Sequence, residues 1–411
     1  MSNPLEGKRI VLGVTGSIAA YKAADLASKL TQAGALVDCV LTESAVRFVG
    51  PITFQSVTGR KAYTDRNLWE SEGHVVHIGL GHSADLLLIA PVSANTLAKL
   101  ANGIGDNLLT VTALAATCPL VLAPAMDAGM YAHPATQKNL ETLRKRGATF
   151  IGPEPGHLAS GLVGLGRFAE PQTILEQVRF IFGRGGTLTG KKVLITAGPT
   201  QEAIDPVRFI SNHSSGKQGF AIAQALLDEG AEVTLVSGPV NLDPPAGVEL
   251  VKVTSAAEMK NTVMEHLAEQ DAFISVAAVA DYRPGSVAGE KIKKSGAGMN
   301  LELVPTEDIL RSVSEWRKDA KPGMLVIGFA AETTNLYEHA FRKLQEKSLD
   351  LIVANDVSLP EPVFGADSNK VAFLHPNGQV EKYDWMSKAA VGEALGRFLV
   401  ERLETPEDEG R

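Results

Sequence analysis

Residues 8–30 read KRIVLGVTGSIAAYKAADLASKL, and residues 191–209 read KKVLITAGPTQEAIDPVRF. Each stretch opens with a basic pair and continues as a run of apolar, largely β-branched residues that leads into a glycine-containing turn. Such runs are typical of buried parallel strands, and the residues 18–33 after the first turn have helical periodicity. Each stretch therefore predicts the opening of an α/β unit, and we expect two such units in the chain.

Short apolar runs alternate with helix-period stretches through both halves of the sequence. The expected strands cover 9–13, 36–41, 85–90, 119–123, 148–151, 192–196, 232–236, 272–276, 325–329 and 350–353. The expected helices cover 18–33, 94–102, 107–116, 134–146, 171–182, 217–229, 255–269, 335–347 and 386–403. The predicted fold class is α/β, with two doubly wound Rossmann-like domains, the first of them flavodoxin-like. Ligands should bind beyond the carboxyl ends of the strands.

Length and composition agree with two domains. The chain has 411 residues, and its 39 Lys and Arg against 47 Asp and Glu give a net charge of −8. This acidity argues against a general nucleic-acid binder. The segment Phe182–Gly190, FGRGGTLTG, contains four glycines and is typical of a linker. We therefore predict domains over 1–183 and 191–411, joined by a linker over 184–190.

The sequence predicts an intracellular setting. Its two cysteines, Cys39 and Cys118, allow no disulfide framework and no zinc-binding spacing. No apolar run approaches the roughly 20 residues that span a bilayer, so no membrane partner is expected. The N-terminus reads MSNPLEGKR and leads directly into a strand, without the apolar region of a signal peptide. These features predict a cytoplasmic protein.

Hydroxyl and small residues follow three expected strands of the first half. They lie in Thr15–Ile18, Leu41–Ser44 and Ala90–Thr96. The first of these also opens a helix, where backbone N–H groups and the helix dipole favour an anion. Because the carboxyl ends of parallel strands meet at one edge of a sheet, we expect a site there for a phosphorylated aromatic ligand.

The second half offers parts for a nucleotide-dependent reaction. Gly198–Thr200 follows its first strand, Ser211–Lys217 precedes a helix, and Glu290–Lys294 supplies three lysines. The SSGKQG segment is not a Walker loop, because it lacks the first glycine at the required spacing and Lys217 precedes Gln rather than Ser or Thr. Such parts suit the activation of a carboxylate by a nucleoside triphosphate.

Long motifs in both halves resemble one known family. In the first half, GSIAAYK, APVSANT, APAMDAGM and ASGLVGLGR are similar to the flavin-dependent cysteine decarboxylases. In the second, AGPTQEAIDPVRFISNHSSGKQG, AAVADYRP, EKIKK and GFAAET with LIVANDV resemble the phosphopantothenate–cysteine ligases. The whole chain is therefore similar to the bifunctional flavoproteins of bacterial coenzyme A biosynthesis.

For the first half, the resemblance implies FMN-dependent decarboxylation of 4′-phosphopantothenoylcysteine to 4′-phosphopantetheine. The flavin oxidises the thiol-bearing carbon, CO₂ leaves, and the hydride returns. His77 matches the family's catalytic histidine, and a neutral imidazole can accept the proton that this oxidation releases. By position, FMN would be bound by Gly16, Ser17, Ile18, Thr42, Ser93, Ala94, Asn95, Thr96 and Ala125.

Two positions depart from the decarboxylase pattern. Asp127 follows Pro-Ala-Met where the family has an Asn that holds the substrate carboxylate. An ionised Asp127 would repel that carboxylate unless it is protonated or paired with a cation. Ser160 lies where the family has a proton-donating Cys in a flap, and a hydroxyl is a far weaker acid. Three outcomes stay open: complete decarboxylation with altered acid–base partners, release of an enethiol, or a catalytically silent flavin half.

For the second half, the resemblance implies ligation of 4′-phosphopantothenate to L-cysteine through an acyl-cytidylate, with CTP and Mg²⁺. Lys291 would stabilise charge as the acyl-cytidylate forms, and Asn212 would hold it during attack by cysteine. Arg208 and Asn212 resemble substrate-binding residues. The nucleotide would be bound by Asp281, Lys291, Asp308, Ile309, Phe329, Lys343 and Lys347. The base could also be adenine, and no metal ligands are assigned.

The family also implies a homo-oligomer, with trimers of the flavin domain and dimers of the ligase domain, giving a dodecamer. Two rival functions are a non-catalytic flavoprotein that regulates a partner and an NAD(P) oxidoreductase. His77 and the complete ligase motifs argue against the first. The second lacks support because neither strand–turn carries G-x-G-x-x-G.

Overall fold

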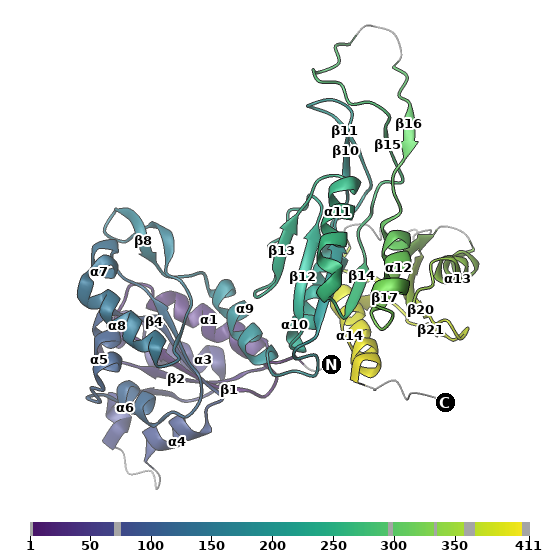
Figure 1. Cartoon of the computed structure of the whole chain (residues 1–411). Coiled ribbons are helices and arrows are strands. Elements are labelled where there is room, and N and C mark those ends of the chain that lie inside the picture. The colour runs from purple at the N-terminus through teal and green to yellow at the C-terminus, as the bar shows by residue number, and fades with distance from the viewer. Residues whose placement is uncertain (1–2, 70–74, 295–298, 333–334, 357–365, 405–411) are drawn as a thin grey trace. The chain divides into compact units, whose positions relative to one another are not determined.

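The structure is a computed structural model (Figure 1). It describes residues 3–69, 75–294, 299–332, 335–356 and 366–404. The chain forms two compact units, Ser2–Phe182 and Gly183–Arg411. Each is described by itself below. Among the described residues, no helix has the length and apolar character needed to cross a membrane.

The first unit is built on a parallel sheet with the order β3-β2-β1-β4-β5-β6. Its strands are β1 (Arg9–Val14), β2 (Leu36–Leu41), β3 (Ala62–Thr64), β4 (Leu86–Val92), β5 (Leu120–Pro124) and β6 (Thr149–Phe150). After β1 the chain adds strands on one side, and from β4 it adds them on the other. The order therefore reverses between β1 and β4, which is where a doubly wound sheet binds its ligand.

Helices cover both faces of this sheet. They are α1 (Ala20–Gln32), α2 (Glu43–Val46), α3 (Pro51–Thr58), η1 (Asp65–Trp69), α4 (Val76–Ser83), α5 (Ala94–Asn102), α6 (Leu108–Ala115), α7 (Ala128–Ala132), α8 (Pro134–Lys145) and α9 (Pro171–Gly183). Buried residues of α1, α3 and α9 form one core cluster, and those of α5, α6 and α8 form another. A hairpin of β7 (Glu154–His157) and β8 (Val163–Arg167) lies outside the sheet.

The second unit contains a larger sheet with the order β13-β12-β9-β14-β17-β18-β20-β21. Its strands are β9 (Lys192–Ala197), β12 (Glu232–Ser237), β13 (Glu249–Lys252), β14 (Ala272–Ser275), β17 (Leu325–Glu332), β18 (Leu351–Asp356), β20 (Val371–Leu374) and β21 (Val380–Lys382). The pairs from β13 to β18 are parallel, and β20 and β21 are added antiparallel. Here the order reverses between β9 and β14.

Helices and short ribbons complete the second unit. The helices are α10 (Lys217–Asp228), α11 (Ala256–His266), η2 (Leu267–Glu269), α12 (Ile309–Ala320), α13 (Leu336–Glu346) and α14 (Lys388–Glu404). The ribbons are β10 (Gln201–Ala203) with β11 (Phe209–Ser211), β15 (Tyr282–Pro284) with β16 (Leu303–Pro305), and β19 (Ser368–Asn369) with β22 (Met386–Ser387). Figure 1 shows the first two ribbons projecting away from the large sheet.

The predicted α/β class with two doubly wound parallel sheets is confirmed. The first sheet has the six-strand Rossmann order rather than the flavodoxin order. The expectations missed α12, although its buried residues recur at helical spacing, and they missed α2, α3, α4 and α7, whose four to eight residues span few turns. They also missed the ribbons, whose strands have two or three residues and so carry little periodicity.

Candidate active sites

In the first unit, the loops after β1 and β4 are joined at the point where the strand order reverses. The hydroxyl of Thr15 donates to the Pro91 carbonyl at 2.8 Å and accepts from the Ser93 backbone N–H at 2.9 Å. Ser93 in turn caps α5, since its hydroxyl accepts from the N–H of Thr96 at 3.3 Å. The predicted flavin-binding residues 16–18 and 93–96 therefore lie on adjoining loops.

The ends of β2 and β5 reach the same edge. The Thr42 N–H donates to the Val14 carbonyl at 3.1 Å, and the Ala125 N–H donates to the Val92 carbonyl at 3.2 Å. A Cβ on Gly16 would lie 2.5 Å from the Cβ of Ser44, so the backbone approach there requires glycine. Predicted residues from four strand ends thus meet at one edge of the sheet.

This edge fits the phosphate of a flavin nucleotide. Among the described residues, the backbone N–H groups of Gly16, Ser17 and Ile18 donate no hydrogen bond within the protein. Consecutive N–H groups that point away from other acceptors at a helix start are suited to an anion. The arrangement can hold a phosphate without a lysine or arginine.

Asp127 and Ser160 are in direct contact. Ser160 lies between β7 and β8, and its hydroxyl donates to Asp127 Oδ2 at 2.7 Å. Asp127 also caps α7 by accepting from the Gly129 N–H at 2.9 Å. The hydrogen bond from Ser160, with that from Gly129, lowers the pKa of Asp127 below its ordinary value. No ion pair to Asp127 is present among the described residues, so it is an unpaired carboxylate at neutral pH.

His77 lies on α4, which packs against α6 and η1. Its Nδ1 is buried and has no hydrogen-bond partner in the described part of the chain. The described residues show no hydrogen bond between His77 and Asp127 or Ser160. Among the described residues of a single chain, the predicted histidine is therefore not hydrogen-bonded to the Asp127–Ser160 pair.

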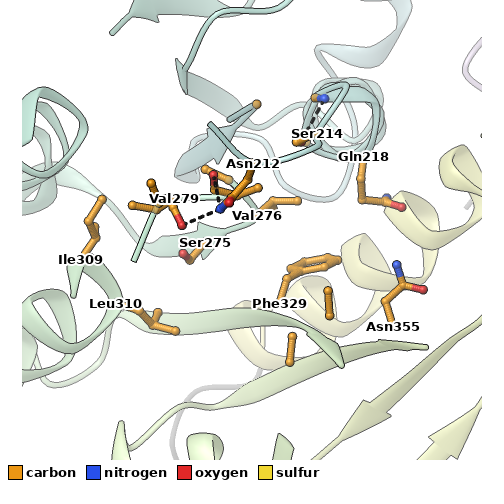
Figure 2. Close-up of a pocket in the computed structure, with 18 of the residues that line it drawn as sticks. Asn212, Ser214, Gln218, Ser275, Val276, Val279, Ile309, Leu310, Phe329 and Asn355 are labelled. Atoms are coloured by element: carbon orange, nitrogen blue, oxygen red, sulfur yellow. Dashed lines mark hydrogen bonds between the residues drawn. The ribbon is translucent and has the colours of Figure 1, made fainter. Parts of the chain in front are cut away.

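The second unit contains a cavity of about 760 Å³ beyond the carboxyl ends of β9, β14 and β17 (Figure 2). It lies where the strand order reverses. Six of the predicted ligase residues line it, namely Asn212, Asp281, Asp308, Ile309, Phe329 and Lys347. Gly216, the N-cap of α10, also lines it with a φ of 75°, a conformation that favours glycine. The helix start therefore opens into the cavity.

Asn212 is fixed by two backbone carbonyls. Its Nδ2 donates to Val279 O at 3.0 Å and to Ala278 O at 3.3 Å, and Figure 2 shows the Asn212 amide beside Val279. These bonds assign the amide nitrogen to the backbone side and leave its oxygen free to accept from a ligand. Only an amide, not a carboxylate, can donate in this way.

Asp308 and Lys347 form an ion pair at 2.6 Å at the edge of the cavity. Burial alone would raise the pKa of Asp308, but the Lys347 ammonium and the N–H of Arg311 outweigh it and lower that pKa. Asp308 also caps α12 by accepting from the Arg311 N–H at 3.0 Å. Lys343, four residues before Lys347 on α13, does not line the cavity.

Arg208 and Lys291 lie outside the cavity lining, and a buried carboxylate joins their segments. Asp205, whose side chain is 0% exposed, accepts from the N–H groups of Val207 at 2.8 Å, Arg208 at 2.9 Å and Ile292 at 3.1 Å. The Arg208 guanidinium donates to the Ile292 carbonyl at 2.9 Å. Lys291 is exposed and directly precedes Ile292, the residue that these bonds hold.

Four further polar residues line the cavity, and the sequence predicted no role for them. Gln218, Asn355, Asn369 and Lys388 all line it. They come from α10, β18, β19 and the start of α14, which are far apart in the sequence. Asn355 lies in the motif LIVANDV and Gln218 in the motif SSGKQG, and neither motif assigned these residues a role.

Comparison with known proteins follows the division into units. The family model named Flavoprotein matches residues 1–182, and the model named DNA/pantothenate metabolism flavoprotein C-terminal domain matches residues 188–403. The coenzyme A biosynthesis bifunctional protein CoaBC of Bacillus subtilis is 47% identical over 390 residues, which cover 94% of this chain and 95% of that protein. The chain belongs to the CoaBC family.

Other CoaBC proteins match over a similar extent. That of Escherichia coli K12 is 43% identical over 408 residues and covers 98% of both chains. A crystal structure of the C-terminal domain of a CoaBC protein is 43% identical, covers 53% of this chain and 98% of that one, and has a TM-score of 0.46. The full-length CoaBC relatives and the two family models confirm the resemblance that the motifs predicted.

Proposed function

We propose that the second unit ligates 4′-phosphopantothenate to L-cysteine with CTP. A carboxylate oxygen of phosphopantothenate attacks the α-phosphorus of CTP, and pyrophosphate leaves. The amine of cysteine then attacks the acyl carbon, CMP leaves with the bridging oxygen, and the amine loses one proton. Membership of the CoaBC family and the cavity at the strand reversal carry this proposal.

The cavity residues would divide this work. Asp281, Asp308, Ile309, Phe329 and Lys347 would bind the nucleotide from the cavity wall, and Lys343 would approach it from outside that lining. Asn212 would hold the acyl-cytidylate through its free amide oxygen, and Arg208 would contribute to the acyl-substrate side. Lys291 would reach the reacting phosphates from the brace formed by Asp205 and Arg208, and would stabilise the charge that develops there.

Magnesium would enter with the nucleotide. The described residues contain no group of three or more His, Cys, Asp or Glu side chains placed to hold a metal ion. Mg²⁺ is commonly bound by substrate phosphates, water and only one or two carboxylates. Asp281, which lines the cavity, would supply such a carboxylate.

We propose that the first unit binds FMN and decarboxylates the product of the ligase, 4′-phosphopantothenoylcysteine, to 4′-phosphopantetheine. Bound FMN would accept two electrons with a hydride and return them after CO₂ has left. The loops after β1, β2, β4 and β5 would hold it, with the unpartnered N–H groups at residues 16–18 on its phosphate. An imidazole nitrogen of His77 would accept the proton released on oxidation.

The contact between Asp127 and Ser160 favours a second possibility for this unit. The carboxylate of Asp127 is ionised and would repel the carboxylate of the substrate, and the Ser160 hydroxyl is committed to Asp127. Either effect would slow the reaction. The unit would then release an enethiol, or bind FMN without turnover and act as a regulatory flavoprotein.

One assay separates these functions. Purified protein is incubated under argon with phosphopantothenate, CTP, Mg²⁺ and cysteine, and in parallel with phosphopantothenoylcysteine alone. Pyrophosphate, CMP and amide in the first reaction support the ligase. Phosphopantetheine in the second supports complete decarboxylation, an absorbing enethiol supports arrested reduction, and no CO₂ supports a silent unit. No pyrophosphate in the first reaction would contradict the ligase proposal.

A cytoplasmic location and assembly into trimers, dimers and a dodecamer remain predictions. Exposed apolar side chains beside the flavin edge, including Ile18 at 57% and Tyr21 at 60%, support contact with further copies of the chain. Light scattering of the purified chain measures the assembly directly.

A further inference from the structure

One side of the ligase cavity holds buried polar groups that the roles above leave unused. We call Gln218, Asn355, Asn369 and Lys388 the Lys388 corner. Asn369 is only 4% exposed and Lys388 only 8% exposed. In Figure 2, Gln218 and Asn355 lie on the opposite side of the view from Ile309 and Leu310, which belong to the predicted nucleotide side.

A chain of hydrogen bonds fixes both amides of this corner. The Lys388 carbonyl can only accept, so the Gln218 amide presents its nitrogen to it, at 3.1 Å. The Gln218 oxygen therefore faces Asn369, whose Nδ2 donates to it at 2.8 Å. The Asn369 oxygen is what remains, and it is buried without a partner among the described residues. A buried acceptor in this state requires a donor from outside the protein.

Asn355 can supply a second acceptor, because no hydrogen bond among the described residues fixes which atom of its amide faces the cavity. Its Oδ1 is also buried without a partner in the described part of the chain, and its residue lines the same cavity. Two amide oxygens without donors form a poor surface for phosphate, because phosphate oxygens are acceptors too. They suit a ligand that carries an amine or ammonium group.

Lys388 adds a cation to these acceptors. Its ammonium donates to the carbonyl of Ala366, and no ion pair of Lys388 is present among the described residues. The neighbouring Asp367 pairs with Lys217 at 2.7 Å. Burial lowers the pKa of Lys388, and the charge of Lys217 lowers it further. An anion bound beside Lys388 would favour the charged ammonium and so offset both effects.

We propose that the Lys388 corner binds the amino-acid substrate of the ligase: Lys388 takes the α-carboxylate, and the amide oxygens of Asn355 and Asn369 accept hydrogen bonds from the α-amine. This inference rests on the proposed ligase function, and it assigns the position of the attacking amine. Cysteine carries its carboxylate and an amine with at least two N–H donors on one carbon, whereas the carboxylate of phosphopantothenate is two methylenes away from a single amide N–H. The amine would thereby be held in the cavity that contains Asn212.

The test compares Lys388→Met with Lys388→Arg and with Lys252→Met, a control at an exposed position on β13. Lys388→Met should raise the KM for cysteine roughly 10- to 100-fold, the size of a lost charged hydrogen bond. The KM for CTP, and pyrophosphate release from CTP and phosphopantothenate without cysteine, should stay at wild-type values. Lys388→Arg should restore most of the affinity for cysteine, and Lys252→Met should match wild type.

Cysteamine, which lacks the carboxylate, provides the decisive comparison. Wild type should prefer cysteine over cysteamine in kcat/KM, and Lys388→Met should lose most of that preference by losing activity with cysteine alone. An unchanged preference, or an equal loss in pyrophosphate release, would overturn the assignment. If Lys388→Met does not fold, an undiminished affinity of Asn355→Leu for cysteine contradicts it. Absence of pyrophosphate with wild type would instead contradict the ligase function itself.

Discussion

At position 160 the chain has a hydroxyl where its resemblance to the decarboxylases predicts a thiol. In this chain the hydroxyl donates to Asp127 at 2.7 Å, so both departures from the family pattern meet in one hydrogen bond. The sequence predicted each departure separately. It could not predict their contact, because the two residues are 33 positions apart and meet only when the β7–β8 hairpin folds over α7.

Ser160→Cys should therefore accelerate formation of phosphopantetheine from phosphopantothenoylcysteine. A thiol with a pKa near about 8.5 is a far better proton donor than a hydroxyl, and general acid catalysis is worth roughly 100-fold or more. The measurement is the anaerobic rate of product formation. Ser56→Cys, at an exposed position on α3, is the control for an added thiol. An equal rate in wild type and Ser160→Cys would show that proton donation does not limit the reaction.

Two substitutions should separate the halves of the ligation. Lys291→Gln should reduce pyrophosphate release at least roughly 100-fold, because it removes the charge that we propose stabilises the transition state. Asn212→Asp should release pyrophosphate but accumulate acyl-cytidylate, because a carboxylate cannot donate to the carbonyls of Ala278 and Val279. Quench-flow with labelled CTP measures both. Lys294→Gln, at an exposed position in the same segment, is the control, and full activity of both variants would refute the assignments.

At the scale of the elements, the turn between β10 and β11 holds the segment that carries Lys291. Asp205 bonds to three backbone N–H groups, including that of Ile292. Burial raises the pKa of Asp205, but these N–H groups and Arg208 outweigh burial and lower it. The sequence marked Arg208 and Lys291 through motif similarity. It gave no signal for Asp205 as the link, because the bond spans 87 positions.

Asp205→Asn should lower the stability of the second unit at pH 7. A carboxyl whose pKa is lowered by folding stabilises the native state above its unfolded pKa of about 3.9, and this contribution disappears as the pH falls through the lower folded value. The difference in urea midpoint between wild type and Asp205→Asn should thus be large at pH 7 and shrink below pH ~4. An equal difference at pH 7 and pH 3 would contradict the role of the charge.

The long elements were predictable, and the small ones were not. The central strands were found because residues such as those of β4 are buried on both faces and read as an apolar run. Short ribbons such as β10–β11 and β15–β16 depend on contacts with each other, so their own residues carry no clear period. The Lys388 corner escaped prediction for a related reason, since four separate elements supply its members.

On the scale of the whole molecule, two units with their own sheets occupy one chain. Ligands that bind one unit should stabilise that unit alone. At 100 times its Kd, a ligand adds about 2.7 kcal/mol to the stability of the unit that binds it. Differential scanning calorimetry should show two unfolding transitions, with FMN raising one and CTP with Mg²⁺ raising the other. A single transition raised by both ligands would contradict independent unfolding.

The joining of both units in one polypeptide also has a metabolic consequence. Each molecule synthesised adds one ligase site and one decarboxylase site, so expression can change the total capacity but never the ratio of the two. The steady-state level of the shared intermediate is then set by the two turnover numbers and by the affinity of the flavin unit for it. If Ser160 slows the flavin unit, the cellular concentration of the amide intermediate therefore rises, and no change in gene dosage could compensate.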